Sequence, residues 1–186
     1  MSLTSTDSAV LSSVTCPDRL VHAVRAEVRL GLGWQKTADH VARALRGNLP
    51  DTADLLPADL RRGDPACYQS HLLYAEPDGS FSIAAMVWLP GQETVIHDHV
   101  AWCVTAVLRG REYEEIFTLV EGGRALALSA RNVNPAGSVG GFAPPGDIHR
   151  VRNTGDSVAI SMHFYGADIS RLGNSIRREY TLPVLR

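Results

Sequence analysis

From about residue 66 onward, the chain is a series of short apolar or alternating segments, each ended by a turn rich in glycine and proline. Alternation with a period of two places successive side chains on opposite faces of a strand. Many such strands at regular spacing are typical of a β-sandwich or β-barrel. We therefore predict an all-β domain. The predicted strands cover residues 68–75, 80–88, 101–108, 111–119, 124–129, 138–142, 149–152 and 158–165.

The preceding part of the chain has helical periodicity. Apolar residues recur every three or four positions from Leu20, and Asp18 is a candidate N-cap for this first helix. Thr37 is the candidate N-cap of a second helix, which Gly47 ends. We expect a flexible N-terminus (1–16) followed by one domain (17–186). Its predicted parts are a helical layer (17–65), a β-barrel (66–170) and a C-terminal strap (171–186).

Composition excludes several classes of protein. The chain has 186 residues, 45% of them hydrophobic and 20% charged, which suits one soluble globular domain. The net charge of −2 gives no reason to expect a nucleic acid or a membrane as partner. No apolar run is long enough to cross a bilayer, and the first residues lack a secretory signal pattern. Three cysteines without paired spacing favour a reducing cytoplasm.

Three histidines form the most informative pattern for function. His97 and His99 are two residues apart, so on a strand both imidazoles point to one face. His149 follows a Pro-Pro-Gly turn about 50 residues later and offers a third nitrogen. Imidazole ligands suit Fe(II), Zn, Cu or Ni, and ligand type alone does not choose among these metals.

These histidines lie in motifs that resemble the two signatures of the cupin superfamily. The first signature is matched by Gly91, His97, His99 and Gly110, with Cys103 where the superfamily usually has glutamate. The second is matched by Pro144, Gly146, His149 and Asn153. The resemblance implies a small cupin barrel, that is, a double-stranded β-helix or jelly-roll, and it agrees with the helical layer in front.

Within the cupins, the chain resembles cysteine dioxygenases and the bacterial thiol dioxygenases, including 3-mercaptopropionate dioxygenase. The replacement of glutamate by Cys103 and the later run Ser161-Met-His163-Phe-Tyr165 are features of that group. The resemblance extends over roughly residues 66–170. It implies Fe(II) held by His97, His99 and His149, and the addition of both atoms of O2 to a small thiol such as L-cysteine, which gives a sulfinic acid.

The resemblance also implies roles for residues near the metal. Tyr165 would hydrogen-bond the substrate or the bound oxygen species, and His163 and Ser161 would orient it. Cys103 matches a residue that forms a thioether crosslink to tyrosine in animal-type enzymes, and the alternative is a reduced, buried thiol. Trp102 either forms a wall of the pocket or belongs to the core.

The groups that bind the substrate carboxylate in this family are missing here. Counting back from His97, the position of the arginine in animal-type enzymes falls on His71, with Gln69 where a tyrosine is usual. The arginine of the bacterial enzymes falls on Asn174. Gln69, His71 and Arg171 remain as candidate substrate-binding residues, although neutral donors replace a bidentate arginine poorly.

Several alternatives therefore stay open. The substrate could be L-cysteine, 3-mercaptopropionate, mercaptosuccinate or another small thiol. A cupin that binds a metal and a small ligand without turnover, an isomerase and a dioxygenase acting on carbon are the other classes. We expect a monomer or weak homo-oligomer whose partners are a small thiol and O2.

Overall fold

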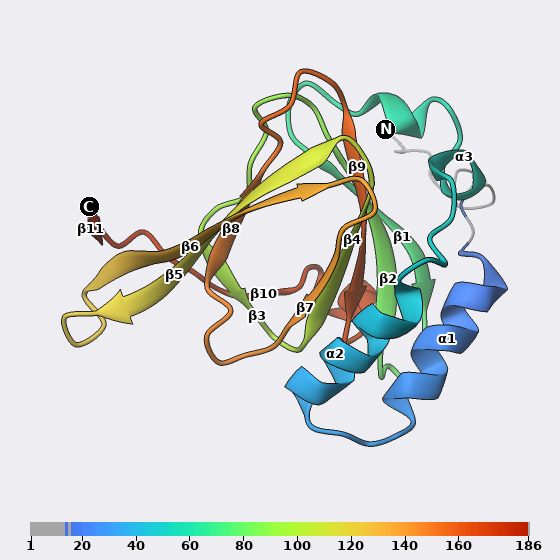
Figure 1. The fold of residues 1–186 in the computed structure, drawn as a ribbon, viewed down its shortest axis with the longest axis horizontal. Coiled ribbons are helices and arrows are strands. Elements are labelled where there is room, and N and C mark those ends of the chain that lie inside the picture. Colours follow the sequence, from blue (N-terminus) through green and yellow to red (C-terminus); the bar gives the residue numbers. More distant parts are fainter. Residues whose placement is uncertain (1–13, 15, 186) are drawn as a thin grey trace, which may run out of the picture.

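The computed structural model describes residue 14 and residues 16–185, so the predicted flexible N-terminus lies almost wholly outside the described residues. The chain forms a mainly β architecture preceded by short helices (Figure 1). The helices are α1 (Asp18–Val28), α2 (Trp34–Leu45), α3 (Thr52–Leu55), the 3-10 helix η1 (Leu60–Arg62) and α4 (Ile169–Leu172). The strands are β1 (Gln69–Ala75), β2 (Ser82–Trp88), β3 (His97–His99), β4 (Cys103–Arg109), β5 (Arg111–Val120), β6 (Ala125–Pro135), β7 (Val139–Phe142), β8 (His149–Arg152), β9 (Ala159–Tyr165), β10 (Ile176–Glu179) and β11 (Val184–Leu185).

The strands form two sheets that curl around one interior. One sheet has the order β1-β2-β9-β4-β7, and the other has the order β10-β3-β8-β5-β6-β11. Neighbouring strands are antiparallel except β11 and β6, which are parallel. The hairpin of β5 and β6 extends away from the helices in Figure 1. This arrangement confirms the predicted all-β class, a small barrel of two sheets with an N-terminal helical layer.

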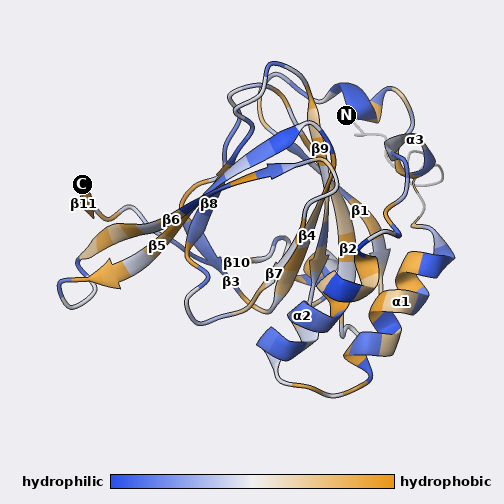
Figure 2. Cartoon of the chain, viewed as in Figure 1, coloured by the Kyte–Doolittle hydropathy of each residue, from blue (hydrophilic) through white to orange (hydrophobic). Residues whose placement is uncertain are grey.

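The helical layer explains why the central strands are buried on both faces. On β9, Ile160, Met162 and Phe164 pack in the main hydrophobic core with α1 and α2. The alternate residues of β9 point to the barrel interior and are also buried. Figure 2 shows hydrophobic residues on the helices and on β9, whereas β8 and the beginning of β5 are hydrophilic. One face of β9 is therefore available for polar chemistry.

Helix α2 lies directly against the edge strand β7. A Cβ atom at Gly141 of β7 would lie 2.8 Å from the backbone oxygen of Ala38, so the close approach of helix and strand requires glycine. This contact fixes the helical layer on the sheet. No helix among the described residues is long and apolar enough to span a bilayer.

Both predicted helix caps are wrong. Asp18 is the first residue of α1, and the N-cap is Pro17, without a side-chain cap. Helix α2 begins at Trp34 with Gly33 as N-cap, so Thr37 lies inside the first turns. Thr37 is buried against the core, and its hydroxyl donates to the backbone oxygen of Leu32 at 3.1 Å. The burial of Thr37 thus determines where helix α2 starts, and the preference of threonine for the N-cap position does not.

The C-terminal strap is more regular than a loop. It begins in the second half of α4 and continues to β10, which pairs with β3, the strand of the first two histidines. β10 was not predicted because its sequence, Ile-Arg-Arg-Glu, does not alternate between apolar and polar residues. Its partner strand determines its conformation, and the strap is thereby held beside the strand that carries His97 and His99.

Candidate metal centre

The three predicted histidines converge at one point in the barrel interior. β3 carries His97 and His99 on the same face, and the pairing of β3 with β8 places His149 directly opposite His97. One ring nitrogen from each histidine lies within 4.8 Å of the other two. All three side chains are buried. The arrangement could hold a metal ion.

The other ring nitrogen of each histidine lies within hydrogen-bond distance of an oxygen acceptor. The pairs are His97 Nδ1 with Val95 O at 2.9 Å, His99 Nδ1 with Asp147 Oδ2 at 3.1 Å, and His149 Nδ1 with Glu114 Oε1 at 2.7 Å. Because each acceptor requires a proton on Nδ1, each Nε2 keeps its lone pair. This tautomer is the one that a shared metal requires, and the hydrogen bonds also orient the rings.

The electrostatics of the centre favour neutral histidines beside ionised carboxylates. Burial, followed by the neighbouring His149 and His99, lowers the pKa of His97 to about 3, and burial also lowers the pKa of His99. Burial alone would raise the pKa of Asp147 and of Glu114, but hydrogen bonds from His99 and His149 lower them overall. The donor set is therefore ready for a cation without prior deprotonation.

A cavity of about 130 Å³ opens onto the three histidines. Its lining includes polar groups from four parts of the chain: Tyr68 and Ser70, Thr94, His163 and Tyr165, and Asn174 and Ser175. Within the described part of the chain, no Lys, Arg, Asp or Glu lines it. A second cavity, about 240 Å³, borders the carboxylates Glu114 and Asp147 behind the metal ligands. The smaller cavity is the candidate substrate pocket because it contains all three histidines.

The predicted Ser-His-Tyr run forms a hydrogen-bonded chain, which we call the relay (Ser161, His163 and Tyr165). The Tyr165 hydroxyl lies 3.1 Å from His163 Nδ1, and His163 Nε2 lies 3.1 Å from Ser161 Oγ. Burial, followed by the charges of the three metal-site histidines, lowers the pKa of His163 to about 3. Burial also raises the pKa of Tyr165 well above its ordinary range. Both residues are therefore neutral near pH 7.

Cys103 lies directly opposite Tyr165 across the pairing of β4 with β9. Its thiol is fully buried in a small cluster with Ala84 and Tyr165, and burial raises its pKa well above the ordinary value. All three cysteines of the chain are unpaired. Cys103 is thus positioned beside the relay as a protonated thiol.

The structure corrects the predicted substrate-binding residues on β1. Gln69 and His71 do not line the pocket, whereas Tyr68 and Ser70 do. The reason is the period of two, because a shift of one residue in counting exchanges the two faces of the strand. The buried ring nitrogen Nε2 of His71 has no hydrogen-bond partner in the described part of the chain.

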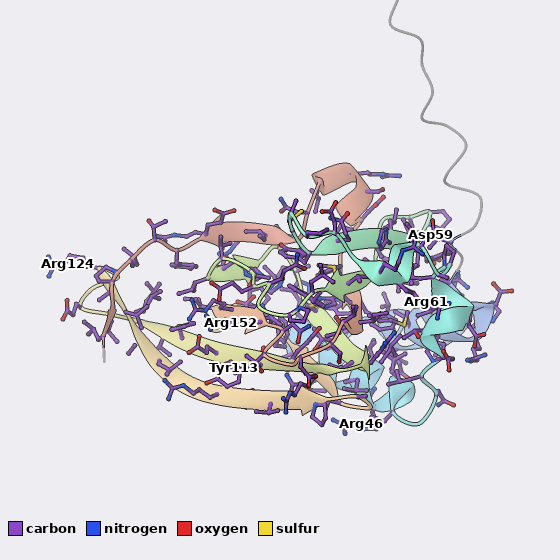
Figure 3. All side chains as sticks on the ribbon, turned by 90° about the horizontal axis from the view of Figure 1, so that it is seen from above. Arg46, Asp59, Arg61, Tyr113, Arg124 and Arg152 are labelled. Carbon is purple, nitrogen blue, oxygen red and sulfur yellow. The ribbon has the colours of Figure 1, made fainter. Side chains whose placement is uncertain are left out.

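The two other predicted substrate contacts also lie elsewhere. Trp102 belongs to the main core beneath the helices, where it packs against Gly166. The Arg171 side chain is 70% exposed and pairs with Asp168 at 3.0 Å. Figure 3 places Arg124 on the outer hairpin and Arg46 beside α2. No arginine therefore takes the place of the missing carboxylate anchors among the described lining residues.

Sequence reasoning missed the outer partners of the metal ligands. Asp147 stands two residues before His149 in the Pro-Pro-Gly turn, but nothing local indicates that it reaches His99. Glu114 is one of several charged residues on β5, and only its pairing across from β8 identifies it. Both assignments depend on contacts between segments far apart in the chain.

No family model matches the chain. Similar solved structures include an oxalate oxidase in complex with glycolate, at 20% identity and a TM-score of 0.44, covering 56% of this chain and 53% of that one. An RmlC-like cupin protein from Desulfovibrio desulfuricans has 21% identity and a TM-score of 0.43, covering 62% and 96%. A cupin superfamily protein from Desulfitobacterium hafniense has 16% identity and a TM-score of 0.45, covering 65% and 96%. The present chain spans about half of the oxalate oxidase.

Proposed function

We propose that the protein is an Fe(II)-dependent dioxygenase that converts a small thiol into a sulfinic acid. The observation that carries this proposal is the relay, which ends beside the three-histidine centre with Cys103 opposite Tyr165. A protein that only binds a ligand at its metal does not need a buried chain of proton-bearing groups. The run also coincides with the residues by which the sequence resembles thiol dioxygenases.

The residues present fit an iron ion. Three neutral imidazole nitrogens supply the donor set, and their fixed tautomers leave each Nε2 free. When bound, Fe(II) would supply an open, positively charged position for a thiolate and for O2. His97, His99 and His149 would hold it, while Glu114 and Asp147 orient two of these ligands.

The protein's own groups would bind and orient the substrate. The pocket is small, and Gly173–Ile176 of the strap form part of its wall. The Tyr165 hydroxyl borders the same cavity, so it can hydrogen-bond the reacting atoms. His163 Nδ1 hydrogen-bonds that hydroxyl, and Ser161 hydrogen-bonds the other ring nitrogen of His163.

The pocket points to a small thiol whose carboxylate is not clamped by arginine. Tyr68, Ser70 and Asn174 offer neutral hydrogen bonds instead of a guanidinium. Breaking a hydrogen-bonded charge pair costs about 2–5 kcal/mol. Among the described lining residues, no Lys or Arg can form such a pair with a substrate carboxylate. We therefore propose that L-cysteine, 3-mercaptopropionate and mercaptosuccinate gain little over thiols without a carboxylate, such as cysteamine. The proposed setting is the cytoplasm, with the thiol and O2 as partners of a monomer or weak homo-oligomer.

The test is O2 uptake by protein loaded anaerobically with Fe(II), with each of these thiols and mass detection of the sulfinate. Sulfinate formation by the wild type and its loss in His97→Ala support the proposal. Cysteamine turnover within about tenfold of the best carboxylate thiol, about 1.4 kcal/mol, supports the unclamped pocket. Absence of sulfinate with every thiol, despite bound iron, contradicts the dioxygenase.

The missing carboxylate anchors favour a second candidate, a metal-bound cupin that binds a small ligand without turnover. In that case, iron-loaded protein would bind a thiol without consuming O2. Calorimetric titration of the anaerobic protein with the same thiols, followed by the uptake assay, separates the two candidates.

A further inference from the structure

A buried carboxyl group lies at the inner end of the relay. Glu112 on β5 is 2% exposed, and its Oε1 has no hydrogen-bond partner in the described part of the chain. Side-chain hydrogen bonding from Ser161 and from Trp88 lowers the pKa of this carboxyl. Trp88 Nε1 also donates to Ser161 Oγ at 3.3 Å. Glu112 therefore extends the chain of hydrogen bonds away from the metal pocket.

Among the described residues, no cation contributes to the pKa of Glu112. Glu114 on its own strand raises the pKa of Glu112, and Glu112 in turn raises the pKa of Cys103 on β4 and of Tyr165 on β9. From the neighbouring strand β6, Asn134 lies opposite Glu112.

On the other neighbour, β8, Arg152 is ion-paired with Glu93 instead. Burial raises the pKa of Glu112 to about 7, although hydrogen bonding from Ser161 acts in the opposite direction. An isolated buried carboxylate is costly, so the neutral acid is accessible near neutral pH.

Hydrogen counting links the charge of Glu112 to the direction of the relay. If Glu112 is protonated, it donates to Ser161, which donates to His163 Nε2. The proton of His163 then lies on Nδ1 and is donated to Tyr165, whose own proton points into the pocket. If Glu112 is ionised, Ser161 donates to it, His163 Nε2 donates to Ser161, and Tyr165 donates to His163 Nδ1.

We propose that Glu112 is the proton-holding end of the relay and sets whether the Tyr165 hydroxyl donates into the pocket or away from it. The two states differ by one proton. Each group passes its proton to the next, from Glu112 through Ser161 and His163 to Tyr165, and Tyr165 releases one proton to a water molecule in the pocket. Every intermediate residue ends neutral, and only Glu112 becomes charged.

Glu112 is therefore a positioning residue that acts through Tyr165. The part of this inference that concerns turnover rests on the proposed dioxygenase function, whereas the coupling of Glu112 to Tyr165 does not. The two can be tested separately, since the coupling is present in metal-free protein.

The first experiment is an infrared pH titration of metal-free protein between about pH 5 and 9. In the wild type and in Glu121→Gln, an exposed control on a turn, we expect a protonated carboxyl band that disappears with a midpoint near pH 7. Glu112→Gln should lack the band, and Ser161→Ala should shift its midpoint, which assigns the band even if Glu112→Gln folds poorly. No such band in the wild type overturns the proposal.

The second readout is the C–O vibration of Tyr165, assigned with Tyr165→Phe. It should change with the same midpoint in the wild type, but not in Glu112→Gln or in Ser161→Ala, where the chain is interrupted. If the C–O vibration of Tyr165 does not change with the ionisation of Glu112, the coupling is overturned.

If sulfinate is formed, the pH profile of kcat should lose its step near pH 7 in Glu112→Gln while KM is retained. An intact step in Glu112→Gln contradicts a role in turnover. Absence of sulfinate in all variants contradicts only the dioxygenase.

Discussion

Each histidine of the candidate metal centre is oriented by a hydrogen-bond acceptor, and two of the three acceptors are carboxylates. His-x-His predicts a shared face because the period of a strand is two, and this local rule needs no tertiary information. The acceptor Asp147 comes from the turn before β8 and Glu114 from β5, so only the barrel shows that they reach the histidines. Metal affinity therefore resides in a wider set of residues than the sequence motifs indicate.

Replacing one acceptor should weaken metal binding without removing a ligand. In Glu114→Gln, His149 Nδ1 loses a charged acceptor at 2.7 Å, and the ring loses its fixed orientation. We expect iron affinity to fall about 10- to 100-fold. Competition with a chelator measures this. Glu115→Gln is the matched control, since the neighbouring carboxylate pairs with Arg150 instead, and equal losses in both variants would contradict the assignment.

The register of Cys103 and Tyr165 leads to a covalent prediction. Directly opposed side chains on antiparallel strands have Cβ atoms about 4.5–5.5 Å apart, and the two residues share one cluster. We predict a thioether between Sγ and the tyrosine ring after turnover, with O2 as the oxidant that removes two hydrogens. Intact-protein mass should decrease by two hydrogens, and Cys103→Ser should show no change. An unchanged wild-type mass would identify Cys103 as a buried, reduced thiol.

The strap is the element that links the pocket to the metal-binding strand. Asp98 lies between His97 and His99 but faces away from them, where Arg177 and Tyr180 of the strap bind its carboxylate. Ser175 accepts a backbone hydrogen bond from Val100 at 3.0 Å, close to the pocket. The charged strap sequence conceals this role, because β10 is defined by its partners rather than by its own periodicity.

Neutralising Asp98 should loosen the strap. The Asp98 side chain is 1% exposed, and Tyr180 donates to it at 2.8 Å. We expect Asp98→Asn to lower the free energy of unfolding by about 1–3 kcal/mol, the usual effect of weakening buried hydrogen bonds to a charge. Urea denaturation measures the loss. Arg177→Ala should cost less because Arg177 is 56% exposed, and a larger loss in Arg177→Ala would contradict this ranking.

At the scale of the whole molecule, the two faces of one sheet have separate tasks. The face of β2, β4 and β9 toward the helices is apolar, while the interior face carries the relay. Strand periodicity predicts this division well, and the barrel class follows from it. The choice of face on β1 was not predictable by counting, because a one-residue offset moves Tyr68 and Ser70 into the pocket instead of Gln69 and His71.

Burying neutral histidines makes the stability of the metal-free molecule depend on pH. The pKa of His97 and of His163 is about 3 in the folded state, against an ordinary value of 6.5, so only the unfolded chain gains these protons between the two values. Stability is therefore lost as pH falls from about 6.5 toward 3, by up to about 1.4 kcal/mol per pH unit for each histidine.

Glu112 has the opposite sign, because its folded pKa of about 7 exceeds the ordinary 4.5. Its contribution is complete below pH 4.5 and disappears as pH rises through about 7, so it offsets part of the loss from the histidines. We predict that, between pH 4.5 and 6.5, Glu112→Gln has a steeper pH dependence of stability than the wild type, by about 1.4 kcal/mol per pH unit. Urea unfolding of both metal-free proteins across this range measures the difference. Parallel curves would mean that Glu112 is ionised in the folded protein. Its buried negative charge would then be compensated by groups other than its present neighbours.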